Sequence, residues 1–513
     1  MNGEFRCDIS RNTFDKKKHF SRVLMQQGRV QLDADWNEQS DILLHYMQTL
    51  AKDLMGHFAV IEKGFAITIP SVDVEYGTFD IGRGRCYVEG ILCENESEDE
   101  LCGTSKAKSS KPVGEPEGLD YLHQPDYPIN KVEIPPSDLP LMVYLDVWER
   151  HISCIEDDDI REKALEGPDT ATRSKTVWQV KVLSGNSSNI WKEKNWGSDP
   201  MQKCGKIFVY WPDIVRSDLQ NPYRGCLSAQ AKKPSGNDTD PCIISPDSRY
   251  RRAENQLYRV EIHRGGVVGE GDRNATFKWS RDNGTNVFPI SFISDKEFTL
   301  EHLGRDDRSS LNVGDWVEVI DDDYTLLIGS RPSPLHEPTP LAQVMSVSLT
   351  EMKVTLDSLP NYNVNMDKHP LLRRWDFKEG DPKQPDQAKL AKEGNVVFGL
   401  YVKEGKCDSP NALGWLTLED GVQICFRKPD ADKKNEYQAG DYWLIPARTA
   451  TGDVEWPFKD QTKSQRVACP PHGIEHHYAP LAVIYQDQNN WVATECRCTI
   501  QPLSKCPDET KPN

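Results

Sequence analysis

Hydrophobic side chains recur at helical spacing between residues 35 and 55. They fall every seventh residue, with a second row one turn away, so that together they form one continuous stripe. The members of this helix stripe are Trp36, Leu43, Met47, Leu50 and Leu54. The pattern predicts a single amphipathic helix, about 30 Å long at the usual rise per residue.

Polar residues and glycines mark the ends of the predicted helix. Asp35 is expected as its N-cap, and Glu38, three residues later, completes a capping box. Gly56 is expected to stop the helix. Before the helix, Gly28 permits a tight bend, and residues 30–33 alternate in polarity, which predicts a short extended segment.

Two interpretations of the helix stripe are open. The stripe either packs against the protein's own body, as in most amphipathic helices, or forms a seam with a partner or another copy, for which fewer than three heptads are present. The arm before the helix is locally basic in a chain of net charge −18, and such asymmetry can steer an acidic neighbour. Its basic residues are Arg6, Arg11, Lys16, Lys17, Lys18, Arg22 and Arg29. The residues expected to interact are Arg29, Leu32, Trp36, Leu43, Met47, Leu50 and Leu54.

Alternating hydrophobic and polar positions cover most of the remaining chain, which predicts a mainly β, multidomain protein. The expected architecture is an N-terminal arm plus one helix, followed by β-sandwich and small β-barrel modules. The expected segments are 1–62 (arm and helix), 63–105 (β-hairpin region), 106–140 (linker or surface excursion), 141–295 (β-sandwich with an insertion at 184–250), 296–365 (small SH3-like barrel) and 366–513 (C-terminal β domain).

Three local predictions are specific enough to be checked residue by residue. Residues 78–95 read as a hairpin that turns at Glu89 and Gly90. Residues 204–211 read as a short strand inside the insertion. The barrel is expected to bury Trp316, Val319, Val344 and Val354.

Composition narrows the classes of function. The net charge of −18 argues against nucleic-acid binding, which needs a basic face. No apolar run is long enough to span a bilayer, and residues 1–20 lack the apolar core of a signal peptide, so we expect neither membrane insertion nor a signal peptide. The 14 cysteines are expected to be reduced by default, with Cys86 and Cys93 as a pair that can oxidise outside the cell.

Candidate chemistry is sparse along the chain. His472, His476 and Cys469 are weak candidates for Zn²⁺ ligands, because prolines beside them prevent helical spacing; packing is the favoured interpretation. The acidic triplets 157–159 and 321–323 are expected to be solvated turns. No catalytic or cofactor-binding residue is predicted, and no cofactor is expected. Four tryptophans are candidates for a sugar-binding cleft or for the core: Trp375, Trp415, Trp443 and Trp456.

The segment FSRVLMQQGRVQLDADWNEQ resembles the N-terminal signature of an uncharacterised family encoded near phage-tail-like extracellular contractile injection systems. The G-R-x-x-L step followed by D-x-N-E and a helix is similar to the start of many phage tail-fibre and baseplate proteins. Later segments that extend the resemblance are GRCYVEGILCEN, GPDTATRSKTVWQVKV, ATFKWSRDNG, VGDWVEVIDDDY and GDYWLIPARTATGDVEWP.

The resemblance implies a structural component of such a particle, baseplate-associated, fibre-like or spike-surrounding, and not an enzyme. Its expected partners are other particle proteins and further copies of itself, with assembly in the cytoplasm and presence outside the cell as part of a released particle. Two alternatives stay open: a module that binds surface glycans, and a hydrolase whose site carries no recognised motif.

Overall fold

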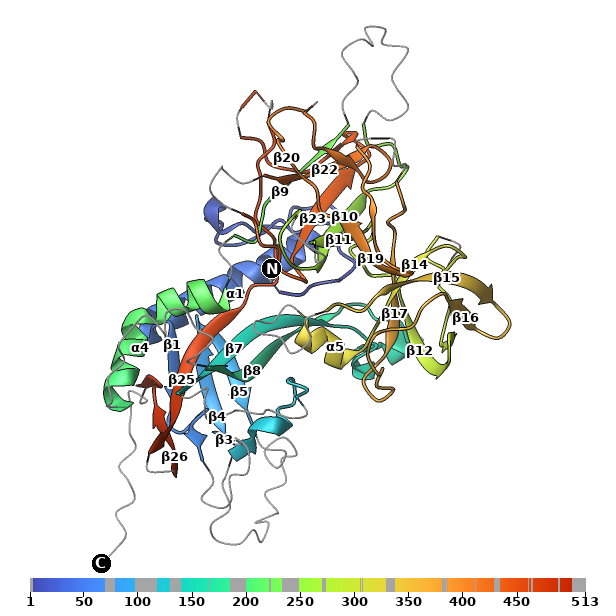
Figure 1. Cartoon of the computed structure of the whole chain (residues 1–513). Helices are drawn as coiled ribbons and strands as arrows, with labels where there is room; N and C mark the ends of the chain where they lie inside the picture. The colour runs from blue at the N-terminus through green and yellow to red at the C-terminus, as the bar shows by residue number, and fades with distance from the viewer. Residues whose placement is uncertain are drawn as a thin grey trace, which may run out of the picture. The chain divides into compact units, whose positions relative to one another are not determined.

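The structure is a computed structural model of the 513-residue chain (Figure 1). It describes residues 3–500 except 70–78, 97–117, 130–139, 166, 185–199, 221–222, 233–248, 270–273, 305, 307, 329–336, 381–383, 385, 411, 429–433, 460, 463–464 and 488–489. The chain divides into two compact units. Unit 1 comprises 1–39, 149–175 and 221–475, and unit 2 comprises 40–148, 176–220 and 476–513.

The helix that the stripe predicts is present as α1 (Asp33–Met55). It ends where expected, because Gly56 adopts φ +86° and its N–H donates to the Lys52 carbonyl. It begins at Asp33, three residues before the first helical position that an N-cap at Asp35 implies, so Asp35 lies inside the first turn and is not the N-cap. Glu38 is not part of a capping box either, since its carboxylate accepts a hydrogen bond from the Thr13 hydroxyl.

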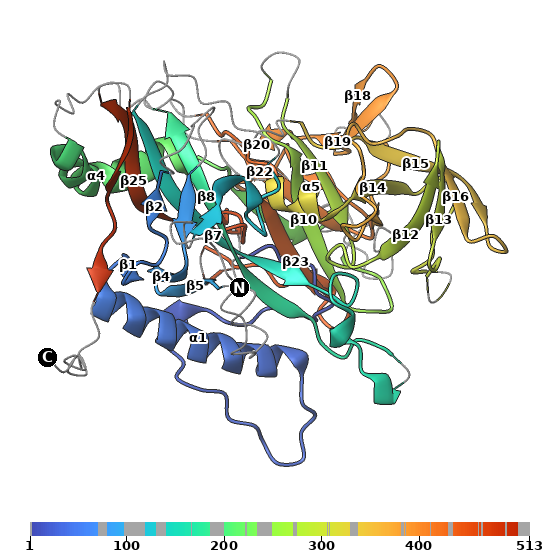
Figure 2. The ribbon, with the colours of Figure 1, turned by 90° about the horizontal axis from the view of Figure 1, so that it is seen from below.

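The arm before α1 contains one turn of 3-10 helix, η1 (Lys16–Lys18), followed by an open loop that leads into the N-terminal end of α1 (Figure 2). Gly28 provides the expected bend with φ +70°. Residues 30–33 form no strand, which corrects the prediction of an extended segment. Their alternation has no neighbouring strand to pair with, and Val30 and Leu32 are exposed.

Unit 1 is built around a 12-stranded sheet whose pairings are antiparallel. Its order is β14-β17-β12-β13-β16-β15-β19-β11-β10-β23-β24, with β18 beside β19. The strands are β10 (Gln256–Arg264), β11 (Thr276–Ser280), β12 (Val287–Ser294), β13 (Glu297–Leu300), β14 (Trp316–Ile320), β15 (Leu341–Ser348), β16 (Lys353–Leu356), β17 (Leu371–Trp375), β18 (Leu390–Glu393), β19 (Val396–Tyr401), β23 (Tyr442–Arg448) and β24 (Asp453–Val454).

Six of these strands close into a small barrel, because β14 pairs with β15 as well as with β17. The barrel core contains three of the four residues predicted for it, namely Val319, Val344 and Val354, and Trp316 is also buried, in the adjoining core of unit 1. The barrel is larger than the predicted segment 296–365, since β12 and β17 complete the ring. The alternation pattern found the core positions, whereas ring closure depends on strands distant in sequence.

A second sheet of unit 1 contains β20 (Glu404–Gly405), β21 (Leu416–Thr417), β22 (Val422–Arg427) and β9 (Leu227–Ala231). Side chains from both sheets share one large hydrophobic core that includes Tyr258, Phe277, Trp443 and Phe426. Unit 1 also holds the short helices η4 (Asp158–Ile160), η5 (Lys163–Leu165) and α5 (Asp322–Leu327).

Unit 2 contains three sheets, with strand orders β27-β1-β4-β5, β2-β3-β6 and β26-β25-β7-β8. β7 and β8 each continue into unit 1 at one end. The strands are β1 (Phe58–Ile61), β2 (Ile67–Thr68), β3 (Asp80–Gly82), β4 (Gly84–Val88), β5 (Ile91–Asn95), β6 (Gly118–Asp120), β7 (Leu141–Ile152), β8 (Arg173–Ser184), β25 (His477–Asp487), β26 (Asn490–Glu495) and β27 (Thr499–Ile500). Its helices besides α1 are η2 (Tyr121–His123), α4 (Pro200–Ile214) and the π-helical η6 (Val215–Leu219).

The predicted hairpin is confirmed as β4 and β5, which turn at Glu89 and Gly90, both with positive φ. Cys86 and Cys93 face each other across it, and both are free thiols. The predicted strand 204–211 is wrong: these residues lie in α4, which buries Ile207 and Trp211. A short apolar run fits a buried strand and a helix equally well, so the pattern alone did not decide.

Several expected segments have a different organisation. Of the linker 106–140, residues 106–117 and 130–139 lie outside the described residues, whereas 118–129 hold β6 and η2 with buried Tyr121 and Tyr127. The insertion 184–250 contributes α4 and β9. Strands β10–β12 belong to the large sheet of unit 1, and β7 and β8 belong to a sheet with β25 and β26.

Candidate interaction surface and charged cavity

α1 is held to the protein by the side opposite its hydrophobic stripe. Ala34 and Ile42 are buried on that side. In unit 1, Gln39 accepts a hydrogen bond from the Val23 N–H at 2.8 Å. In unit 2, Lys52 pairs with Glu89 in the β4–β5 turn at 2.5 Å. Buried apolar side chains and polar contacts therefore both fix α1.

The helix stripe itself faces solvent. The exposed fractions are 75% for Trp36, 55% for Leu43, 69% for Met47, 60% for Leu50 and 76% for Leu54. This contradicts the interpretation that the stripe packs on the protein's own body. Two further large side chains, Leu44 and Tyr46, are exposed beside it. We call this surface the α1 outer face: Trp36, Leu43, Leu44, Tyr46, Met47, Leu50 and Leu54.

The arm adds a second group of exposed hydrophobic side chains: Phe20, Leu24, Met25, Val30 and Leu32. Together, the arm and the α1 outer face hold twelve of the twenty-five exposed large hydrophobic side chains among the described residues. Such a concentration within residues 20–54 is typical of an interaction surface, because scattered exposed residues are normal and contiguous ones are not. All seven residues predicted to interact are exposed.

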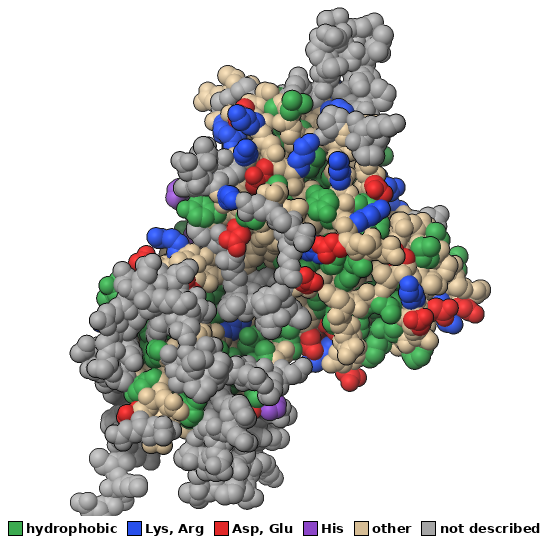
Figure 3. All heavy atoms as spheres, viewed as in Figure 1, with side chains coloured by type: hydrophobic (Ala, Val, Ile, Leu, Met, Phe, Trp, Pro, Cys, Tyr) green, Lys and Arg blue, Asp and Glu red, His purple; other side chains and the backbone are tan. Residues whose placement is uncertain are grey.

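The basic character of the arm is weaker than its composition suggests. Arg6 is buried against Glu4 and Glu261, and Arg11 pairs with Glu455 at 2.9 Å. The remaining basic residues of the arm are exposed: Lys16, Lys17, Lys18, Arg22 and Arg29. On the face shown in Figure 3, Lys and Arg side chains are interspersed with Asp, Glu and hydrophobic side chains.

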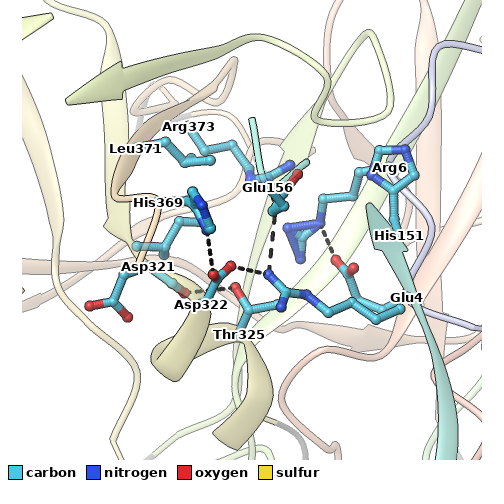
Figure 4. Close-up of a pocket in the computed structure, with 12 residues that line it drawn as sticks. Glu4, Arg6, His151, Glu156, Asp321, Asp322, Thr325, His369, Leu371 and Arg373 are labelled. Atoms are coloured by element: carbon cyan, nitrogen blue, oxygen red, sulfur yellow. Dashed lines mark hydrogen bonds and ion pairs between the residues drawn. The ribbon is translucent and has the colours of Figure 1, made fainter. Parts of the chain in front are cut away.

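A small cavity in unit 1 is lined mainly by charged side chains (Figure 4). Its lining residues come from the N-terminus, the end of β7, the start of α5 and the surroundings of β17: Glu4, Arg6, Arg150, His151, Glu156, Ile320, Asp321, Asp322, Thr325, His369, Leu371 and Arg373. None of the charged residues among them was a sequence-based site candidate. The signal was present as charged residues within hydrophobic strands, such as the two arginines in LLRRW.

Asp322 is the centre of one ion-pair group in this cavity. Arg150 donates to its carboxylate at 2.5 Å, and His369 Nδ1 lies 2.7 Å from the other oxygen. Asp321 does not join this group: its carboxylate accepts the N–H groups of Tyr324 and Asn365 as the N-cap of α5. The triplet 321–323 is therefore a helix start and not the expected solvated turn.

Arg373 differs from Arg6 and Arg150, the other arginines of the cavity, because no carboxylate among the described residues forms an ion pair with it. Its guanidinium donates to the Gly284 carbonyl at 2.6 Å, and its Nε has no hydrogen-bond partner in the described part of the chain. Burial and the neighbouring Arg6 lower its pKa to about 9. Figure 4 shows the side chains of Arg6 and Arg373 approaching each other in the cavity.

The cavity lacks the properties of a substrate site. Its volume is about 20 Å³, which suits a water molecule and is far below the usual size of a ligand pocket. The lining carboxylates balance the guanidinium groups, so no excess positive charge is left for an anion. Its role in this structure is to fix the N-terminal segment, since Glu4 also pairs its backbone with residues 149 and 151.

The candidate metal ligands are engaged separately. In unit 1, His472 accepts a hydrogen bond from the Leu444 N–H at 3.0 Å, and burial lowers its pKa to about 4. Cys469 pairs its backbone with Leu227, and burial raises its pKa to about 11. In unit 2, His476 Nδ1 lies 2.7 Å from Asp146. Within the described ranges, no three His, Cys, Asp or Glu side chains gather as a metal site.

Asp146 forms a second buried ion group. It is completely buried, and Lys181 Nζ donates to its carboxylate at 2.6 Å. Burial raises the pKa of Asp146, but His476 and Lys181 together outweigh this effect and hold the pKa well below its usual range. Aromatic rings lie against the group: Trp148 beside His476 and Tyr127 beside Lys181. These surroundings indicate that the group stabilises the fold.

The thiols only partly follow the expectation of a reduced chain. Cys204 pairs with Cys496 and Cys407 with Cys425, so these four cysteines depart from the reduced state expected by default. Seven described cysteines are free. Cys204 and Cys496 lie 292 residues apart, and spacing in the sequence could not have indicated this pair.

The four tryptophans considered for a sugar cleft are all buried, at 6% exposure or less. They contribute to the core of unit 1, where Trp443 donates to the Cys469 carbonyl and Trp375 donates to Glu318. The structure therefore removes the residues on which the glycan-binding alternative depended. No helix among the described residues is both long and apolar enough to cross a membrane.

Comparison with known proteins gives one match. A family model described as a family of unknown function, DUF6519, matches residues 5–194 and 221–508. No curated protein and no solved structure matches the chain.

Proposed function

We propose that this chain, which belongs to the family of unknown function DUF6519, is a structural component of a phage-tail-like contractile injection particle. It acts by binding other particle proteins through the arm and the α1 outer face. The resemblance of residues 20–39 to the signatures encoded beside such particles supports the kind of assembly.

The observation that carries the proposal is the exposure of the hydrophobic residues in the arm and on α1. Exposed hydrophobic surface costs free energy in water, at about 25 cal/mol per Å², and covering it is the main driving force for association. Residues 24–32 of the arm are all exposed, so a partner can contact them directly. The cavity and the buried ion groups, in contrast, lack the volume and access that a substrate needs.

Two features suit a protein that reaches the exterior inside a particle. The disulfides Cys204–Cys496 and Cys407–Cys425 are of a kind that persists in oxidising surroundings. The cavity of unit 1 is far smaller than a usual ligand pocket. These features support a place outside the cell as part of a released particle.

The test uses a tagged chain expressed in its native cells together with its neighbours. Lysates are fractionated by sedimentation, and fast-sedimenting fractions are imaged by cryo-electron microscopy. We expect the wild-type chain in particles with a tail-like shape. A variant with Leu24→Ser, Met25→Ser and Val30→Ser in the arm should move to the light fractions and keep its melting temperature, because all three side chains are exposed.

The matched control replaces three exposed hydrophobic residues elsewhere in unit 1: Val313→Ser, Leu349→Ser and Leu413→Ser. This control should enter particles as the wild type does. The proposal fails if the wild-type chain sediments only as free protein, or if the arm variant enters particles as efficiently as the control.

A further inference from the structure

The exposed positions of α1 follow the spacing of a coiled coil. Trp36, Leu43 and Leu50 occupy one position of a seven-residue repeat, and Ser40, Met47 and Leu54 the other, with alternating steps of four and three residues. All six are exposed. In heptad notation the first set is d and the second is a.

The remaining heptad positions explain how α1 is attached. The side of the helix that carries b, c and f holds the buried Ala34 and Ile42, together with Glu38 and Lys52, which make the polar contacts described above. The protein therefore binds α1 by the side that a coiled coil leaves outward. The a and d positions, which a coiled coil buries, are exposed.

The flanking positions decide which partner fits. Positions e and g carry Asn37, Leu44, Ala51, Gln39, Tyr46 and Asp53, so only one of the six is charged. If the partner helix were basic, we would expect several acidic residues at these positions of α1, and Asp53 is the one present. An acidic chain of net charge −18 can approach its own copy only along a surface that carries little charge. The α1 outer face meets this condition.

The exposed area is sufficient for a stable contact. The seven large side chains of the α1 outer face expose from 43% to 76% of their surfaces. This corresponds to on the order of 800 Å² per chain, the amount that each partner of a typical stable interface buries. Burial of Trp36 against a second helix would supply a large aromatic anchor.

We infer that α1 pairs with α1 of a second copy of this chain through its a and d positions, forming a short coiled coil. The contact is isologous, because the same face serves both chains. This inference rests on the proposed function only because both use the same surface. It identifies a second copy of this chain as one partner of that surface.

The test measures the mass of the purified full-length chain by analytical ultracentrifugation over a hundredfold range of concentration. We expect a concentration-dependent oligomer for the wild type. Leu43→Asp with Leu50→Asp should raise the dissociation constant at least a hundredfold, because each change places a charge in the seam. The melting temperature at concentrations where the wild type is monomeric should not change, since both residues are exposed.

Two controls carry the same chemical change outside the seam. Thr49→Asp adds a charge at an exposed c position of α1, and Leu349→Asp with Leu413→Asp repeats the double substitution at exposed leucines in unit 1. Both should associate like the wild type. A wild-type chain that is monomeric at every concentration overturns the inference, as does a seam variant that associates like the controls.

The outcome is independent of the particle experiment. A monomeric chain that still enters particles contradicts the α1–α1 contact and leaves the proposed function standing. A chain that self-associates but never enters particles supports the α1–α1 contact and contradicts the proposed function.

Discussion

Substitution of Asp146 by Asn is the sharpest test of the buried ion group in unit 2. The change keeps the size of the side chain but removes its charge, while Lys181, which is 2% exposed, keeps its own. Breaking a buried ion pair on one side typically costs about 3–5 kcal/mol, because an uncompensated charge stays in the interior. The amide has one acceptor oxygen where the carboxylate has two, so His476 and Lys181 cannot both keep their hydrogen bonds, and the upper part of this range applies.

The expected effect on melting follows from the size of unit 2, roughly 200 residues. At about 2–4 °C per kcal/mol for a unit of this size, Asp146→Asn should lower the melting temperature by on the order of 10 °C. Differential scanning calorimetry is the suitable assay, because it separates the transitions of the two units. A second variant, Lys181→Met, removes the cation, and the double variant should recover part of the loss.

The pH dependence gives an independent check with a defined sign. The pKa of Asp146 is lowered in the folded protein, so its contribution to stability is present above the ordinary pKa of about 4 and is lost as the pH falls below it. The wild type should therefore lose stability between pH 4 and lower values more steeply than Asp146→Asn. The reasoning is refuted if Asp146→Asn costs less than about 1 kcal/mol, or if the double variant shows the plain sum of the two single losses.

Three further predictions concern other buried groups. Arg373→Met should leave the thermal stability unchanged or raise it, since the lowered pKa of Arg373 means that its charge is disfavoured in the fold; a calorimetric loss above about 3 kcal/mol would show that its hydrogen bond to Gly284 outweighs this effect. Reduction of Cys407–Cys425 should lower the free energy of unfolding by about 3 kcal/mol, because the bond closes a loop of 18 residues. The measurement is the urea midpoint with and without reductant, in a variant that lacks the other disulfide, and an unchanged midpoint would contradict this. Cys86 and Cys93 should react with maleimide in the denatured protein but at least tenfold more slowly in the native one, since both are buried and burial raises the pKa of the Cys86 thiol to about 12; equal rates by mass spectrometry would contradict the hairpin core.

The sequence predicted α1, its C-terminal end and its hydrophobic stripe, but not the direction in which the stripe faces. Periodicity identifies which residues share a side of a helix, and it contains no information about which side the body covers. The polar contacts that decide this, such as Lys52 with Glu89, depend on a hairpin more than thirty residues away. One practical consequence is that Leu43→Ala with Leu50→Ala should cost little in the monomer, whereas the buried interpretation required several kcal/mol.

The sequence predicted where strands occur better than which strands pair with each other. The hairpin around Glu89 and the barrel core both follow local alternation. The 12-stranded sheet does not, because β10 pairs with β23, which lies almost two hundred residues later. The charged cavity escaped prediction for the same reason: Arg150 and Asp322 are separated by 172 residues.

Closure of the six-stranded barrel affects how this chain can bind other protein chains. A strand at the edge of an open sheet offers unpaired N–H and C=O groups that any extended segment can join. In the barrel, β14 finds β15 on one side and β17 on the other, so none of its six strands remains as such a template. Edge-strand pairing with another chain, which depends on backbone groups and not on side chains, is therefore prevented in this part of unit 1. A contact made through side chains, as we propose for the α1 outer face, can then discriminate between partners.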